Sequence, residues 1–300
     1  MTQFRKDVLV CDLDNTLYDW VAYFVPSFYA MADKAAEIMG CDREKLLDDF
    51  RLVHQRHHDS EHPFALFETR TVRESFRGQP FHEVVRALDP ALHAFNSSRK
   101  RLLELHPGVS STLQTLRASG VVLIAHTESR LYGVVDRLRR FNLTEYFSRI
   151  YCRQRATSKH PNELVDNNWL ADFPMHRVVE LSHHQMKPDP DVLREICSRE
   201  GFSVDHAAYV GDSIARDVLM AKRARVFAIW AAYGAHHNEQ QYAALVRITH
   251  WTSTDVEREK RLRKEAESIS PDYVARSSFS EVIDALQNES LRTSRRTIHL

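Results

Sequence analysis

The stretch VLVCDLDNTL, from Val8 to Leu17, decides the fold because an apolar run ends there in closely spaced carboxylates. Val8–Cys11 consists of aliphatic and β-branched residues and cysteine, a pattern typical of a buried strand. The segment DLDNT (residues 12–16) follows at once and supplies charged and hydrogen-bonding side chains. In open α/β sheets, ligands bind beyond the carboxyl ends of the strands. We therefore expect a buried strand that leads into a functional site.

Strand-like and helix-like segments alternate along most of the remaining chain. The expected strands are 121–125, 150–152, 207–210, 226–230 and 273–275. The expected helices between and after them are 109–119, 131–141, 191–199, 214–221 and 279–286. Such repetition calls for a doubly wound, mostly parallel sheet of the α/β class. Residues 153–180, with Pro161, Pro174 and a polar middle, are expected to form a long insertion. The charged run 255–267 is expected to form a solvated helix.

Residues 20–105 break this alternation and have a helical pattern. Phe28, Met31, Ala35 and Ile38 recur at spacings of three to four residues, while β-branched alternation is scarce. The sequence His106-Pro107-Gly108 then ends the helical stretch. We predict a core domain formed by residues 1–18 and 106–300, and a separate helical domain formed by residues 19–105.

The composition is that of an ordinary globular protein. Hydrophobic residues make up 43% of the 300 residues and charged residues 27%, which excludes wholesale disorder and fibrous repeats. The 41 basic and 41 acidic residues give a formal net charge of +0. Overall charge therefore gives no reason to expect a nucleic acid polymer or an anionic membrane as a partner.

The lack of a recognisable targeting signal, together with the cysteine usage, leads us to expect a cytoplasmic protein. The longest apolar runs, such as Val121–Ala125, are far shorter than the roughly 20 residues that span a bilayer. Residues 1–6 run directly into the first expected strand instead of forming the apolar core of a signal peptide. The four cysteines lie far apart without a CxxC pair, so neither a zinc site nor a disulfide framework is indicated.

Three further motifs follow the first in a fixed order. Thr127 lies just beyond the second expected strand, Lys187-Pro188 lies upstream of the strand 207–210, and Gly211-Asp212 ends that strand, with Asp217 five residues later. Together with DLDNTL, this set resembles the haloacid dehalogenase-like hydrolase superfamily, and in particular its phosphatase branch. The resemblance covers residues 7–234 and 271–286. It implies a doubly wound, Rossmann-like core with a smaller α-helical cap domain, for which residues 19–105 are in the right place.

The resemblance also implies a reaction, the Mg²⁺-dependent hydrolysis of a small phosphomonoester through an aspartyl-phosphate intermediate. Asp12 would be the nucleophile, and Asp14 would protonate the leaving alcohol and then take the proton of the hydrolytic water. Thr127 and Lys187 would stabilise the phosphoryl oxygens by a hydroxyl and a positive charge. Because a phosphate monoester repels a carboxylate, such a nucleophile also needs a metal ion beside it.

The metal ligands implied by the resemblance are oxygen atoms, as Mg²⁺ prefers. They are the Asp12 carboxylate, the backbone carbonyl of Asp14 and the Asp212 carboxylate, with Asp217 supporting the metal shell. One departure from the family pattern is Glu128, where the family usually has asparagine or aspartate after the threonine. Its longer side chain, if ionised, is unfavourable beside a phosphate. Lys159, which lacks a following proline, is a second candidate for the role given to Lys187.

Histidines are frequent, at 17 residues, and fall into groups at 54–62, 183–184 and 236–237. Metal ligation by the first group is conceivable from its spacing, but neither a paired cysteine nor an HExxH frame supports it. Exposed helix and loop histidines are therefore expected. A further hypothesis is that residues 54–62, with Arg51 and Arg56, face the site and bind an anionic substrate.

Two other functions fit the same motifs. The first is a carbon–halogen hydrolase that uses the same nucleophile, although Asp14 argues against it because that reaction has no alkoxide leaving group to protonate. The second is a binding or regulatory protein that has kept the fold and lost turnover. All core motif residues are present, so nothing in the sequence requires this second alternative. The partner implied by the resemblance is a small phosphorylated substrate.

Overall fold

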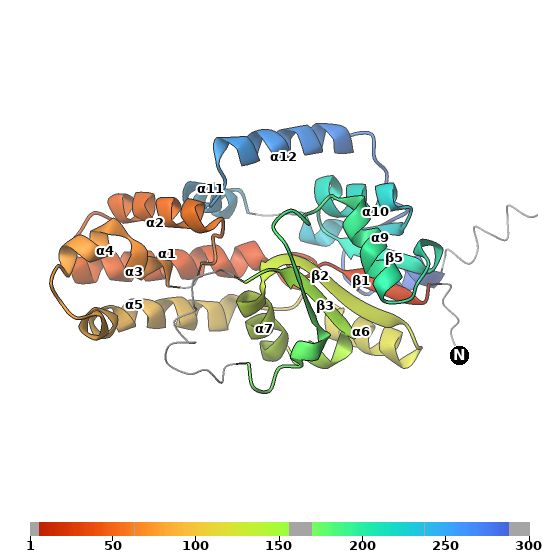
Figure 1. The fold of residues 1–300 in the computed structure, drawn as a ribbon, viewed down its shortest axis with the longest axis horizontal. Helices are drawn as coiled ribbons and strands as arrows, with labels where there is room; N and C mark the ends of the chain where they lie inside the picture. Colours follow the sequence, from red (N-terminus) through yellow and green to blue (C-terminus); the bar gives the residue numbers. More distant parts are fainter. Residues whose placement is uncertain (1–5, 63, 156–169, 237, 288–300) are drawn as a thin grey trace, which may run out of the picture.

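The computed structural model describes residues 6–62, 64–155, 170–236 and 238–287. Its centre is a seven-stranded sheet in the order β4-β3-β2-β1-β5-β6-β7, flanked by helices (Figure 1). Every neighbouring pair of strands is parallel, which confirms the predicted doubly wound α/β fold. The strands are β1 (Val8–Cys11), β2 (Val122–Arg130), β3 (Arg149–Arg153), β4 (Val178–Leu181), β5 (Ala207–Gly211), β6 (Phe227–Ala231) and β7 (Tyr273–Ala275).

The central strand β1 is apolar throughout because helices cover both faces of the sheet. Leu9 and Cys11 belong to one buried cluster, and Val8 and Val10 belong to the cluster on the other face. Successive side chains of a strand point to opposite faces, so both sets must be apolar. The core helices are α6 (Val109–Ala118), α7 (Leu131–Arg140), α9 (Pro190–Arg199), the π-helical turn η4 (Ile214–Val218) and α10 (Leu219–Ala224).

Helices formed by residues 20–102 lie beside the sheet as a separate layer, here called the helical module (Figure 1). They are α1 (Trp20–Met39), α2 (Arg43–His57), α3 (Ala65–Glu68), α4 (Arg70–Ser75) and α5 (Phe81–Leu102). α1 packs along α5, and Phe24 of α1 lies edge-on to Phe95 of α5 with ring centroids 6.4 Å apart. The helical pattern predicted for this stretch is thus confirmed, while the division into two domains stays a prediction.

The long insertion expected at residues 153–180 contains the start of an unpredicted strand. β4 begins at Val178 and pairs with β3 at the edge of the sheet. Its first three residues are only half-buried, so it lacks the apolar run by which the other strands were recognised. Lys159, the second candidate lysine, falls in residues 156–169 and lies outside the described residues.

Two helices near the C-terminus connect the helical module with the core. α11 (Glu239–Ile248) packs against α1 and α2, and α12 (Ser253–Ala266) then crosses to η4 in the core (Figure 1). The charged run forms a helix as predicted, but it is not wholly solvated. Glu259 is only 12% exposed and pairs with Arg216 at 3.0 Å. None of the described helices is both long enough and apolar enough to span a membrane.

Candidate active site

The carboxyl ends of β1 and β5 bring three aspartates together. Cys11 and Val210 are register partners in these neighbouring strands, so Asp12 and Asp212 follow at the same edge of the sheet. Asp217 joins them from η4, and one carboxylate oxygen of each residue lies within 4.8 Å of the others. These three residues, here called the acidic group, were all predicted as metal ligands or as support for the metal.

Asp12 is almost fully buried in this group. Its Oδ1 accepts a hydrogen bond from Lys187 Nζ at 2.5 Å, and its Oδ2 accepts one from the Thr16 hydroxyl at 3.1 Å. The pKa of Asp12 is raised to about 7, chiefly by burial, which the positive charge of Lys187 partly offsets and the Asp217 carboxylate reinforces. The carboxylate is therefore oriented by two donors in surroundings that are short of positive charge.

Lys187 lies between two carboxylates of the acidic group. Its side chain is 4% exposed, and its Nζ is 2.8 Å from Asp217 Oδ1. Asp217 is held in turn by the Tyr209 hydroxyl at 3.1 Å and by the backbone N–H of Ser213 at 3.0 Å. A Cβ atom at Gly211 would lie 2.3 Å from Asp217 Cγ, so only glycine leaves room for this carboxylate.

The acidic group fits a divalent cation such as Mg²⁺. Three carboxylates share one lysine ammonium, so the group carries more negative charge than Lys187 balances. Burial also raises the pKa of Asp212 well above its ordinary value, and Asp217 and Asp12 add to this rise. Carboxylate oxygens are the ligands that such cations prefer.

Asp14 lies apart from the acidic group, within a network of hydroxyl groups. Its Oδ1 accepts a hydrogen bond from the Tyr18 hydroxyl at 2.7 Å, and its Oδ2 accepts one from the Ser129 hydroxyl at 2.5 Å. The Arg137 guanidinium is 3.4 Å from Oδ1. The metal role predicted for Asp14 concerns its backbone carbonyl, so the carboxylate is left for another task.

Arg137 is a buried residue of the Asp14 network that the sequence analysis did not single out. It is 2% exposed and donates hydrogen bonds to the hydroxyls of Tyr18, Tyr23 and Ser129 and to the Glu61 carboxylate, at 2.7–2.9 Å. Tyr18 and Ser129 also donate hydrogen bonds to Asp14, whereas Tyr23 and Glu61 belong to the helical module. Arg137 therefore connects the helical module with the second carboxylate of the DLDNT loop. An arginine within the buried face of α7 was the signal available in the sequence.

Thr127 and Glu128 follow each other in β2 but have different surroundings. Thr127 is 2% exposed, and its Oγ1 accepts a hydrogen bond from the backbone N–H of Ser129 at 3.1 Å. Glu128 accepts one hydrogen bond from the Lys187 backbone N–H at 3.1 Å and another from Arg216 at 2.7 Å. Glu128, whose charge was expected to be unfavourable beside a phosphate, thus pairs with Arg216, which it shares with Glu259.

Within the group at 54–62, the predicted exposure is wrong for two histidines. His54 is 1% exposed and His62 is 7% exposed. His54 Nδ1 lies 2.7 Å from the Ile248 carbonyl oxygen, a contact between α2 and the end of α11 that the sequence pattern does not reveal. Arg56, which the further hypothesis places against a substrate, pairs with Glu68 of the helical module at 3.5 Å.

A family model of haloacid dehalogenase-like hydrolases matches residues 6–225, a range that contains the acidic group, Lys187 and the Asp14 network. The chain belongs to this family. The haloacid dehalogenase-like hydrolases generally use a divalent metal, which agrees with the charge of the acidic group. The motif order noted in the sequence thus identified the family correctly.

Solved structures of the haloacid dehalogenase-like hydrolase fold resemble this chain over nearly its whole length. A 2-haloacid dehalogenase from Pseudomonas syringae pv. Tomato DC3000 is 20% identical, with a TM-score of 0.55 over 95% of this chain and 99% of its own. A HAD phosphatase from Thermococcus onnurineus is 17% identical, with a TM-score of 0.51 over 93% of this chain and 97% of its own. None of the curated proteins matches the sequence significantly. At these identities the likeness establishes the fold.

Proposed function

We propose that this haloacid dehalogenase-like hydrolase is a Mg²⁺-dependent phosphatase that hydrolyses a small phosphomonoester through an aspartyl-phosphate on Asp12. The observation that carries the proposal is the Asp14 carboxylate, which lies outside the acidic group and is hydrogen-bonded to Tyr18 and Ser129. An alcohol leaving group needs a proton, whereas a halide does not. A second carboxylate kept near the nucleophile therefore favours phosphate esters over carbon–halogen substrates.

The reaction begins with attack of an Asp12 oxygen on phosphorus. As the new O–P bond forms, the bond between phosphorus and the substrate oxygen breaks, and that oxygen takes a proton from Asp14, whose carboxylate must bind that proton before the step because it accepts two hydrogen bonds and pairs with Arg137 in the structure. A water molecule then attacks phosphorus and gives its proton to Asp14, while the bond from phosphorus to Asp12 breaks. Inorganic phosphate leaves, and both carboxyl groups return to their starting states.

Positive charge and hydrogen-bond donors make this attack feasible. Lys187 already contacts Asp12 and carries the charge that a phosphoryl group needs. The acidic group and the Asp14 backbone carbonyl would hold Mg²⁺, which supplies further positive charge to offset that of the phosphate. Because Thr127 Oγ1 accepts its hydrogen bond from Ser129, its own hydroxyl hydrogen is left to donate to a phosphoryl oxygen.

The test is phosphate release from a panel of phosphomonoesters with and without Mg²⁺. Asp12→Asn is expected to lower turnover by at least about 10³-fold, because the nucleophile is lost. Asp14→Asn is expected to lower it by about 10²–10⁴-fold, the usual range for a general acid–base group. Asp89→Asn, on the exposed face of α5, serves as the control and should leave turnover unchanged.

Three outcomes would contradict the proposal. Phosphate release that survives Asp12→Asn would show that another group makes the attack. Halide release from 2-haloacids, without phosphate release from any ester, would establish a dehalogenase instead. Binding of Mg²⁺ in a calorimeter without turnover of any ester or haloacid would indicate a regulatory protein that has kept the fold.

A further inference from the structure

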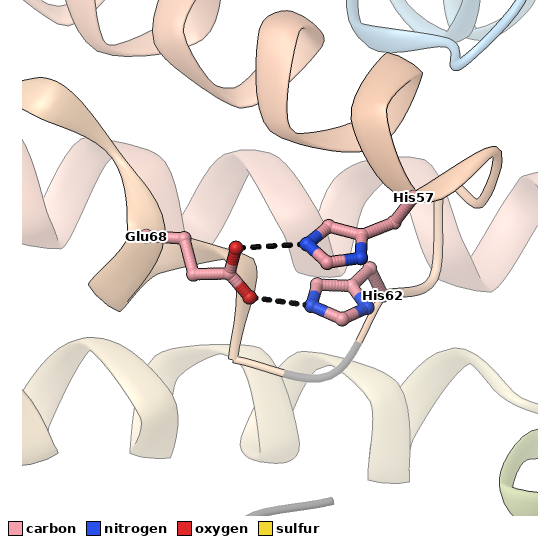
Figure 2. A group of neighbouring side chains, drawn as sticks. All are labelled: His57, His62 and Glu68. Carbon is pink, nitrogen blue, oxygen red and sulfur yellow. Dashed lines mark hydrogen bonds and ion pairs between the residues drawn. The ribbon is translucent and has the colours of Figure 1, made fainter. Parts of the chain in front are cut away.

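The helical module contains a second cluster of metal-ligating side chains, separate from the acidic group (Figure 2). His57 is the last residue of α2, His62 follows a short turn, and Glu68 ends α3. His57 Nε2 is 2.8 Å from Glu68 Oε2, and His62 Nε2 is 2.7 Å from Glu68 Oε1. One ligand atom from each of the three residues lies within 4.8 Å of the other two. We call these three residues the histidine cluster.

The two imidazole rings are aligned towards the same carboxylate. They stack with centroids 3.5 Å apart and planes 7° apart, and both Nε2 atoms point at Glu68 (Figure 2). Tetrahedral zinc, with bonds of about 2.0–2.1 Å, needs ligand atoms about 3.3 Å apart. The nitrogen-to-oxygen spacings are 2.7–2.8 Å and the two rings are parallel, so the cluster must open and the rings must turn until both Nε2 atoms face one ion.

Hydrogen bonding alone leaves this arrangement incomplete. His62 is 7% exposed, yet its Nδ1 has no hydrogen-bond partner among the described residues. A buried histidine with a purely hydrogen-bonding role normally engages both ring nitrogens. Burial lowers the pKa of His62, so at neutral pH the ring is uncharged, and with its single proton on Nδ1 it offers the Nε2 lone pair to a cation on the Glu68 side.

The turn that carries the histidines is fixed by arginines from the core. Arg130 donates a hydrogen bond to the His57 carbonyl at 2.6 Å, and Arg153 donates one to the His58 carbonyl at 2.8 Å. Arg130 also pairs with Asp59 at 3.1 Å. A site whose backbone is already held loses little conformational entropy when an ion binds.

We propose that His57, His62 and Glu68 bind a divalent transition metal of the zinc class, with a fourth position open to water. Two imidazole nitrogens and one carboxylate select zinc and its transition-metal neighbours over Mg²⁺, which prefers oxygen ligands alone. Glu68 is 29% exposed and His57 is 19% exposed, so an ion can enter from solvent on their side of the cluster. Arg56, the other partner of Glu68, is half exposed and can move away.

A metal at this site would restrict a turn that is connected with the DLDNT loop through Arg137. Glu61 lies between the two histidines in the chain and pairs with Arg137 at 2.7 Å, which in turn contacts Asp14. A metal ion on His57 and His62 closes a short loop around Glu61 and restricts its movement. This inference does not depend on the proposed phosphatase activity.

The test is zinc binding by the full chain, purified without a polyhistidine tag and stripped with a chelator. Zn²⁺ is titrated by calorimetry in excess Mg²⁺, so that the acidic group is already occupied. We expect one zinc ion per chain in the wild type. His62→Gln and Glu68→Gln should each weaken zinc binding by at least about 100-fold, because even outer-shell partners of a metal are worth about 10–100-fold. His93→Gln, which changes an exposed histidine paired with Asp89, should bind zinc like the wild type.

A measurement on the wild type keeps the test valid if a variant fails to fold. X-ray absorption of the zinc-loaded protein in excess Mg²⁺ should show two imidazole ligands. Scattering from oxygen ligands alone would place zinc in the acidic group and overturn the proposal. Undetectable zinc binding by the wild type, or unchanged binding by both folded variants, would overturn it as well.

Discussion

Replacing Arg137 tests whether the buried network between the helical module and the core stabilises the protein. Arg137→Met keeps the length and apolar stem of the side chain but removes every donor. Glu61 then loses its 2.7 Å partner, and Asp14 loses an ion pair at 3.4 Å. Breaking a buried ion pair from one side costs about 3–5 kcal/mol. Because Glu61 is 24% exposed, water relieves part of this penalty, and we expect a loss of about 3 kcal/mol.

Arg140→Met on the same helix is the matched control. Arg140 is 39% exposed and pairs with Asp136 one turn earlier, at 2.9 Å. Such surface pairs contribute about 0.3–0.5 kcal/mol. The two variants therefore change the same residue type on the same helix but differ about sixfold or more in the expected loss.

The assay is thermal unfolding followed by circular dichroism at neutral pH. A loss of 1 kcal/mol lowers the Tm by about 2–4 °C in a domain of this size, so Arg137→Met should lower it by about 6–12 °C. Adding Glu61→Gln to Arg137→Met should restore part of the loss, because the carboxylate left without a partner is then neutral. A Tm for Arg137→Met equal to that of Arg140→Met would refute this account of the network.

Three further variants or conditions test other parts of the structure. Gly133→Ala should lower the Tm, because the new Cβ would lie 2.8 Å from an Arg137 nitrogen that is held by hydrogen bonds. Alanine normally stabilises a helix by about 1 kcal/mol relative to glycine, so a raised Tm would contradict this prediction. Glu128→Ala should lower phosphate release about tenfold more than Glu128→Gln, since only alanine removes the acceptor for the Lys187 N–H; equal losses would assign the effect to charge. Burial lowers the pKa of His54 from 6.5 to about 4. Between these pH values the unfolded chain therefore binds a proton more readily than the folded chain does. The stability that is present above pH 6.5 is lost as the pH falls towards 4. Urea unfolding at pH 5 should show a loss of about 2 kcal/mol from this group relative to pH 7.5, and His54→Gln should reduce that pH dependence.

The sequence alone determined the sheet and the place of the acidic group. An apolar run such as Val8–Cys11 can be satisfied only by burial on both faces, and alternation with helices makes the strands parallel. Parallel strands end at one edge, so the residues that follow them must converge there. Asp12 and Asp212 could therefore be placed together from their positions in the chain. β4 escaped prediction because an edge strand needs no continuous apolar run.

Only the tertiary structure decided which polar side chains meet. Arg137 pairs with Glu61, which lies 76 residues away in the sequence, and Glu128 pairs with Arg216, which lies 88 residues away. Hydrophobic periodicity reports which positions are buried, but it carries no information about the partner of a buried charge. The partner depends on the path of the chain between distant elements, because a buried charge is tolerated only where an opposite charge or hydrogen-bond donor is brought within a few ångströms. For the same reason, the histidine cluster became visible only when α2 and α3 were packed together.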